Sequence, residues 1–246
     1  MTAPVFVAEG FAAGGDGRYV LDGPEGRHAV SVKRLRAGED VVLTDGAGRW
    51  ADCVVLDTEG KDRLILRLES VHEEPAEQPR VTVVQALPKG DRGELAVETM
   101  TEVGVDAIVP WAAARCITQW KGERGAKALG KWRATAREAG KQSRRVRFPE
   151  VAEAATSRQV AALLAGAEFA AVLHESGDAP LATADLPATG EIVLVVGPEG
   201  GVAPEELALF EEAGAKAYRL GRSVLRTSTA GTAAAAVLLA RTGRWS

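Results

Sequence analysis

Two short glycine-containing stretches near the end of the chain carry the residue types that could do chemistry. Residues 197–201 read G-P-E-G-G and follow a run of apolar, mostly β-branched residues, 192–196. Residues 220–230 read L-G-R-S-V-L-R-T-S-T-A. Glycine lets a backbone approach a ligand closely, and a glycine-rich turn between a buried strand and a helix is where α/β proteins bind ligands. We therefore expect these two loops to form one site.

The first loop matches no phosphate-binding fingerprint, because it lacks both the G-x-G-x-x-G pattern and the Lys-Ser/Thr pair of a Walker loop. Its carboxylate, Glu199, suits a cation or a hydrogen-bond donor. In the second loop Arg222 and Arg226 flank Val224 and Leu225, which could cover the face of an adenine. The residues alone leave open a simple turn with a solvated glutamate, and arginines that merely pair with nearby carboxylates.

The elements that would position these loops alternate between strand and helix after residue 80. This alternation is the signature of an α/β domain with a parallel sheet. The expected strands are 81–87, 106–110, 168–173, 191–196 and 217–220. The expected helices are 94–103, 125–140, 156–165, one beginning near residue 204, and 228–242.

The N-terminal part reads differently, as short strands joined by tight turns. Strands are expected at 41–44, 50–57 and 64–71, with one helix within 25–35, which fits a small β-barrel. A polar stretch with Pro75 and Pro79 follows. We therefore place a domain boundary near residue 75, giving domains 1–74 and 75–246.

Charge along the 246-residue chain is uneven although its net charge is only −4. The stretch from Arg115 to Arg147 holds eleven Lys or Arg and two Glu. Such a segment on an acidic chain favours phosphate binding, although a solvated helix face remains an alternative. The absence of a long apolar run, a signal peptide and metal-ligand spacing leads us to expect a cytoplasmic protein without a metal.

The paired motifs resemble the SPOUT class of S-adenosylmethionine-dependent RNA methyltransferases, and within it the enzymes that act on small-subunit ribosomal RNA. Further matches are H-A-V-S-V-K-R-L-R at 28–36, P-K-G-D at 88–91, T-E-V-G-V at 101–105 and Q-S-R-R at 142–145. The resemblance covers nearly the whole chain in order. One position departs from it: residue 228 is serine, where the class often has glutamate.

The resemblance implies an N-terminal PUA-like β-barrel that helps hold RNA and a C-terminal α/β domain with a deep trefoil knot. It implies a homodimer that binds S-adenosylmethionine in the knot and methylates N3 of a uridine in 16S rRNA of the small ribosomal subunit. The cofactor-binding residues it implies are Leu173, His174, Gly197, Pro198, Glu199, Gly200, Leu220, Gly221, Val224, Leu225 and Arg226. Candidate RNA-binding residues are Arg27, Lys33, Arg34, Lys89, Arg144 and Arg145.

Methylation at N3 requires that the imide proton leave and that the resulting anion be stabilised. A guanidinium stays protonated, so Arg226 is expected to stabilise a carbonyl oxygen of the uridinate. Glu199 is the expected proton acceptor, with His174 as a second candidate base. Two other functions remain open on the residues: a non-catalytic RNA-binding assembly factor of the same fold, and a small-molecule hydrolase, which lacks a nucleophile elbow.

Overall fold

The computed structural model describes residues 3–12 and 17–245, and these divide into two compact units. The first comprises the described residues up to Ala76 together with Gly140–Phe148. The second comprises Glu77–Ala139 and the described residues from Pro149 onward.

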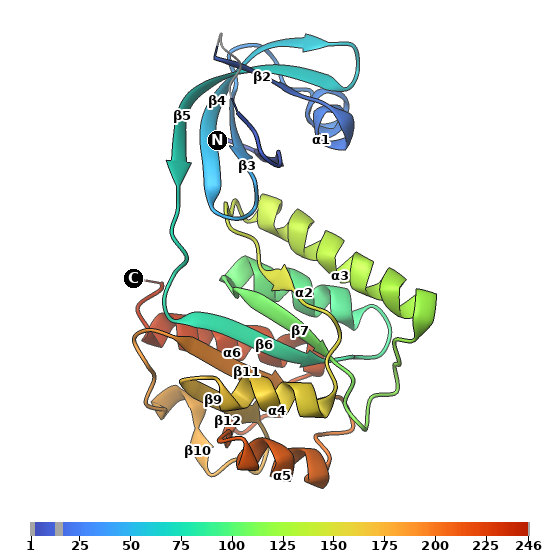
Figure 1. Cartoon of the computed structure of the whole chain (residues 1–246), viewed down its shortest axis with the longest axis vertical. Coiled ribbons are helices and arrows are strands. Elements are labelled where there is room, and N and C mark those ends of the chain that lie inside the picture. Colours follow the sequence, from blue (N-terminus) through green and yellow to red (C-terminus); the bar gives the residue numbers. More distant parts are fainter. Residues whose placement is uncertain (1–2, 13–16, 246) are drawn as a thin grey trace. The chain divides into compact units, whose positions relative to one another are not determined.

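The first unit is built on a five-stranded sheet in the order β1-β3-β4-β5-β2 (Figure 1). Only β1 and β3 pair parallel; the other neighbours are antiparallel. The three expected strands and the helical segment are confirmed, and β1 and β2 are additional. The elements are β1 (Val5–Val7), β2 (Arg18–Leu21), α1 (Gly23–Arg27), the π-helix η1 (His28–Val32), β3 (Asp40–Thr44), β4 (Arg49–Glu59) and β5 (Arg63–Glu73).

Residues 140–148 are part of this unit although they are distant in sequence. The Phe148 backbone N–H donates to the Gly46 carbonyl at 2.8 Å, and the Thr44 hydroxyl donates to the Val146 carbonyl at 2.7 Å. Lys141 and Glu25 form an ion pair at 2.9 Å with both side chains largely withdrawn from solvent. Breaking such a pair leaves a buried charge uncompensated, at a cost of about 3–5 kcal/mol.

The second unit contains a seven-stranded, wholly parallel sheet in the order β10-β12-β9-β11-β6-β7-β8. All five strands expected here are present, and the short β8 and β10 are additional. The strands are β6 (Arg80–Ala86), β7 (Ala107–Trp111), β8 (Glu150–Val151), β9 (Phe169–Leu173), β10 (Ala179–Pro180), β11 (Glu191–Val196) and β12 (Lys216–Arg219).

Helices cover both faces of this sheet (Figure 1). Helices α2 (Arg92–Val103), α3 (Gly122–Gln142) and α6 (Thr227–Arg241) pack on one face, and α4 (Ser157–Ala165) and α5 (Pro204–Glu212) on the other. Strand β11 alternates between them: Ile192 and Leu194 face the first set, Val193 and Val195 the second. Each such fully buried side chain stabilises the fold by about 1.5–3 kcal/mol, which explains the unbroken apolar run.

Local signals set where two of these helices begin and end. Thr156 caps α4 in a capping box with Gln159. Gly104 ends α2 with φ 108°, a left-handed conformation that favours glycine.

None of the helices in the described part of the chain combines the length and apolarity that a membrane span needs. Residues 3–12 and 17–245 also contain no group of three or more His, Cys, Asp or Glu side chains that could hold a metal ion.

Candidate functional site

Parallel strands end at a common edge of their sheet, and the loops after five strands of the second unit meet there. They enclose a cavity of about 600 Å³, a size typical of small-molecule sites. The cavity is lined by Arg92, Arg115, Leu173, His174, Glu175, Val196, Gly197, Pro198, Glu199, Gly200, Gly201, Val202, Tyr218, Arg219, Leu220, Gly221, Arg222, Ser223, Val224, Leu225, Arg226, Thr227 and Ala230. All eleven residues expected to bind a cofactor are in this set.

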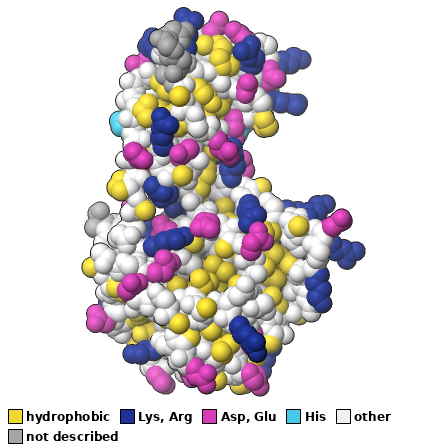
Figure 2. Space-filling model, in the orientation of Figure 1, with side chains coloured by type: hydrophobic (Ala, Val, Ile, Leu, Met, Phe, Trp, Pro, Cys, Tyr) yellow, Lys and Arg dark blue, Asp and Glu magenta, His cyan; other side chains and the backbone are white. Residues whose placement is uncertain are grey.

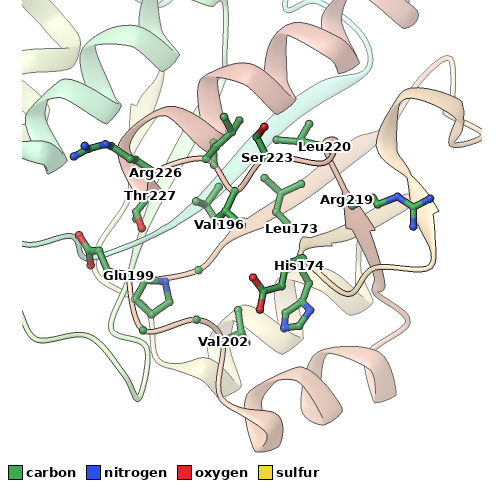
Figure 3. A pocket seen from close by; sticks show the side chains of 18 of the residues that line it. Leu173, His174, Val196, Glu199, Val202, Arg219, Leu220, Ser223, Arg226 and Thr227 are labelled. Atoms are coloured by element: carbon green, nitrogen blue, oxygen red, sulfur yellow. The ribbon is translucent and has the colours of Figure 1, made fainter.

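Figure 3 shows an apolar region in the middle of the cavity with polar side chains on either side. Leu173, Val196 and Leu220 lie in the middle. Arg226 and Glu199 lie on one side, and Arg219 lies on the other. A flat heterocycle could therefore bury its face between the loops while polar groups contact its edges.

The glycine-rich loop leaves little room for a Cβ atom at two positions. A Cβ at Gly197 would lie 2.9 Å from the Val202 Cγ2 atom, and a Cβ at Gly200 would lie 3.3 Å from the Arg115 Cβ atom. Gly201 has φ 73°, which favours glycine. The loop therefore presents backbone rather than side chains to the cavity at these points.

The two expected catalytic residues line the same cavity but do not pair with each other. The Glu199 Oε1 atom accepts the Lys89 backbone N–H at 3.2 Å, while Oε2 has no hydrogen-bond partner among the described residues. Arg226 precedes α6 as its N-cap residue, and its exposed guanidinium makes no hydrogen bond or ion pair within the described chain. Both groups thus have capacity left for a substrate.

His174 is already engaged. Its Nδ1 atom accepts the Ser176 backbone N–H at 3.2 Å and lies 2.7 Å from the Ser176 hydroxyl. A neutral ring that accepts at Nδ1 carries its proton at Nε2. The basic lone pair is therefore directed at Ser176, which disfavours His174 as the proton acceptor.

Cys116 belongs to the loop after β7. Burial raises the pKa of its thiol, and the nearby carboxylates Glu199 and Glu206 raise it further. A thiol with a raised pKa is a poor nucleophile at neutral pH, so this cysteine provides no support for hydrolase chemistry.

Hydrogen bonds join three of the loops around the cavity. The Glu206 carboxylate, 6% exposed, accepts the Ala114 backbone N–H at 2.8 Å and the Ser157 hydroxyl at 2.6 Å. Thr118 donates to the Pro88 carbonyl at 2.8 Å, and Arg115 Nη1 donates to the Gly200 carbonyl at 3.1 Å. These contacts fix the loop after β7 against its two neighbours.

Sequence reasoning missed three arginines of the lining, Arg92, Arg115 and Arg219. Arg115 and Arg219 lie at or just after the ends of expected strands, where ligands of parallel sheets bind. Their position after these strands could have identified them as candidates for the cavity lining.

The expected RNA-binding residues are divided between the two compact units. Arg27, Lys33, Arg34, Arg144 and Arg145 belong to the first unit, whereas Lys89 belongs to the second, beside Glu199. Arg34 and Arg144 have left-handed backbones, with φ 57° and 62°.

The basic segment contains the whole of α3, along which Lys and Arg side chains gather (Figure 2). Of its two tryptophans, Trp132 is buried in the core, and Trp120 packs edge-on against it with ring centroids 5.0 Å apart. These contacts favour a structural role for Trp132.

Ser228 is buried at the start of α6 and is not among the residues lining the cavity. The carboxylates of the cavity lining are those of Glu175 and Glu199.

Two family models match the chain. An RNA methyltransferase PUA domain matches residues 21–69, and an RNA methyltransferase domain matches residues 75–239. The chain is 46% identical over 230 residues to ribosomal RNA small subunit methyltransferase E of Mycobacterium tuberculosis, covering 92% of this chain and 87% of that one. It is 29% identical over 220 residues to the protein of the same name from Bacillus subtilis, covering 86% of each.

Solved structures agree over nearly the full length. A ribosomal RNA small subunit methyltransferase E from Neisseria gonorrhoeae, bound to S-adenosylmethionine, superposes with a TM-score of 0.84 at 28% identity and covers 98% of both chains. A methyltransferase from Legionella pneumophila with bound S-adenosylmethionine gives the same TM-score, identity and coverage.

Proposed function

Because this chain belongs to the ribosomal RNA small subunit methyltransferase E family, we propose that it methylates N3 of a uridine in 16S rRNA. It is an S-adenosylmethionine-dependent rRNA methyltransferase with an N-terminal PUA-like domain. What we propose beyond that is the target atom and the residues that act on it.

The cavity fits the cofactor. Its apolar middle suits the face of an adenine, and the backbone of residues 197–201 and 220–225, which line the cavity, can supply hydrogen-bonding groups to its edges. The cofactor, when bound, supplies a methyl group on an electrophilic sulfonium. The eleven residues named for cofactor binding would hold it.

The chain's own residues would then prepare the uridine. N3 of uracil is a neutral imide N–H at pH 7, so its proton must leave before or during attack. The free Oε2 atom of Glu199 accepts that proton while Oε1 stays on the Lys89 N–H. Arg226, which has no competing partner in the described chain, donates to the carbonyl oxygen on which the negative charge develops.

We further propose that the enzyme is a homodimer in the cytoplasm, where small subunits are assembled. Val224 and Leu225 at the rim of the cavity are exposed apolar side chains that a second protomer would cover. Light scattering should give twice the 25.8 kDa chain mass, and Val224→Glu should shift the mass toward the monomer.

The observation that carries the proposed function is that both motif loops line one cavity in a chain of this family. The test is mass spectrometry of 16S rRNA from unmethylated small subunits after incubation with the protein and the cofactor. A new methyl group on N3 of one uridine is expected. Tight binding without any uridine methylation would instead support the non-catalytic assembly factor.

A further inference from the structure

Arginine is the commonest charged residue in the cavity lining. Five arginines line it, against two glutamates. Arg219 is occupied, because its guanidinium donates to the Gly177 carbonyl at 3.1 Å. Arg92 and Arg226, in contrast, form no side-chain hydrogen bond or ion pair with any residue in the described part of the chain.

Arg92 is held in place by its own helix. It is the first residue of α2, and the next residue, Gly93, lies against the indole of the buried Trp132. A Cβ at Gly93 would lie 2.7 Å from that ring. The backbone that carries Arg92 is therefore fixed before any ligand arrives, which lowers the entropic cost of binding.

Arg115 is held from both sides. Its Nη1 atom donates to the Gly200 carbonyl at 3.1 Å, and the preceding residue, Ala114, is anchored on the buried Glu206. A guanidinium has five N–H groups, so most of the donors of Arg115 are still available. Its side chain is exposed and can reach a ligand that enters from solvent.

An RNA substrate would bring an anionic group that these arginines could bind. Every nucleotide has a phosphodiester on each side of its base, so a uridine beside Glu199 and Arg226 brings phosphates to the surrounding loops. Planar guanidiniums suit phosphate oxygens because they can donate two parallel hydrogen bonds. Glu199 lies on the same side of the cavity as Arg226 (Figure 3). One of its carboxylate oxygens already accepts the Lys89 backbone N–H.

We propose that Arg92 and Arg115 form, with Arg226, a phosphodiester-binding subsite that holds the RNA backbone next to the target uridine. This subsite rests on the proposed function, which makes RNA the substrate. Neither Arg92 nor Arg115 belongs to the motif loops: Arg92 is the first residue of α2, which follows β6, and Arg115 lies in the loop after β7.

The test is equilibrium binding of the full chain, saturated with S-adenosylhomocysteine, to single-stranded RNA oligonucleotides that carry the target uridine. Each oligonucleotide has one phosphodiester replaced by a neutral methylphosphonate. For the unaltered protein, replacement of a linkage next to the uridine should weaken binding about tenfold. In Arg92→Gln and in Arg115→Gln the same replacement should weaken binding less than about twofold, because the partner cation is already gone.

Arg158→Gln is the matched control. Like Arg92, Arg158 lies in the first turn of a helix, α4, without a side-chain partner among the described residues; it is exposed, whereas Arg92 is half-buried, and it does not line the cavity. This variant should respond to every methylphosphonate as the unaltered protein does. Arg92→Lys keeps the charge and should retain part of the affinity that Arg92→Gln loses.

Three results would overturn the subsite. The first is equal sensitivity of Arg92→Gln and the unaltered protein to every methylphosphonate. The second is no binding of the oligonucleotide at all. The third is a tenfold loss of S-adenosylhomocysteine affinity in calorimetry with RNA binding unchanged, which would assign the arginines to the cofactor carboxylate. Binding needs no turnover, so failure of the proposed methylation would appear separately, in the mass spectrum.

Discussion

At the scale of single residues, the contacts of Glu199 and His174 favour Glu199, the first of the two candidate bases named from the sequence. Both side chains line the cavity. His174 directs its lone pair at Ser176, whereas Glu199 keeps one carboxylate oxygen without a partner in the described chain. The proton acceptor is therefore expected to be the carboxylate.

Glu199→Gln tests this role. Glutamine keeps an oxygen for the Lys89 N–H but cannot take up a proton, so single-turnover methyl transfer should slow by about 10²–10⁴-fold. Because Glu199 is also named for cofactor binding, the rate is measured with the protein saturated with cofactor, as judged by calorimetry. Glu175→Gln, at the other carboxylate of the lining, is the control, and an unimpaired rate in Glu199→Gln would refute the assignment.

Arg34 combines a left-handed backbone with an exposed side chain, which is costly for any residue except glycine. We expect Arg34→Gly to be more stable than Arg34→Ala by about 0.5–1 kcal/mol, since only alanine retains the strained Cβ. Both variants should lose the same RNA affinity if the guanidinium contacts phosphate. Urea denaturation and RNA titration of the pair check this, and equal stabilities would contradict it.

Cys53 should make the protein less stable in alkali. Burial raises the pKa of its thiol from 9.0 to about 12. Between those values the unfolded thiol ionises while the folded thiol stays protonated, so the unfolded state binds fewer protons and stability falls as pH rises. The slope attributable to this thiol is up to about 1.4 kcal/mol per pH unit.

Denaturation of the unaltered protein and Cys53→Ala at pH 8, 9 and 10 measures this slope. Alanine leaves a cavity that costs stability at every pH, but the difference between the two proteins should shrink as pH rises above 9. Parallel curves would show that the folded thiol ionises normally.

At the scale of elements, the sequence predicted the long, doubly buried elements well and the short ones poorly. Strand β11 is confirmed at its predicted bounds, because burial on both faces requires an unbroken apolar run. Strands β1, β8 and β10 have two or three residues, too few for any periodicity. The helical segment expected within 25–35 is present, but partly as a π-helix.

The same contrast holds for the site. The two motif loops were predicted because glycine and charge mark them in sequence. Arg92 and Arg115 were missed because their place in the cavity depends on strand order, which brings the loops after β6 and β7 to the same edge. The trefoil knot that the resemblance implies remains a prediction.

Gly26 tests how closely α1 packs in the first unit. A Cβ there would lie 2.1 Å from the Asp62 carbonyl oxygen and 2.5 Å from that of Leu21, both backbone atoms. Gly26→Ala should therefore destabilise the unit by about 3 kcal/mol. Hydrogen exchange measures this effect: amides in peptides of the first unit should lose protection in the variant.

Gly130→Ala is the control for this substitution. Gly130 lies in α3, and a Cβ added there would have no neighbouring atom within 4 Å. Alanine should therefore stabilise the helix by up to about 1 kcal/mol. If both variants gained stability, Gly26 could not lie as close to the carbonyl oxygens of Asp62 and Leu21 as the structure has it.

At the scale of the whole molecule, five of the six expected RNA-binding residues belong to the first compact unit and the cofactor cavity belongs to the second. Arg144 and Arg145 lie in the first unit and the cavity in the second. Charge reversal of both arginines should weaken RNA binding. The slope of the logarithm of the binding constant against the logarithm of the salt concentration should become shallower by about one for each phosphate contact that is lost. Cofactor affinity should stay unchanged.

The measurement is binding to small subunits across a salt series, with calorimetry of the cofactor alongside. Charge reversal of Arg158, on α4 of the second unit, is the control for net charge. Unchanged binding to small subunits at every salt concentration would place the RNA contact elsewhere.

The first unit is not continuous in sequence, and this limits how the gene can recombine. If codons 1–76 were exchanged with those of a homologue, the imported sheet would have to pack against residues 140–148 of this chain. Its contacts to Phe148 and to Lys141, the partner of Glu25, would then join residues from two different parents. A chimera would therefore need codons 140–148 from the same parent. The PUA-like part of this enzyme should be inherited together with a short stretch from the middle of the methyltransferase part, rather than as a cassette.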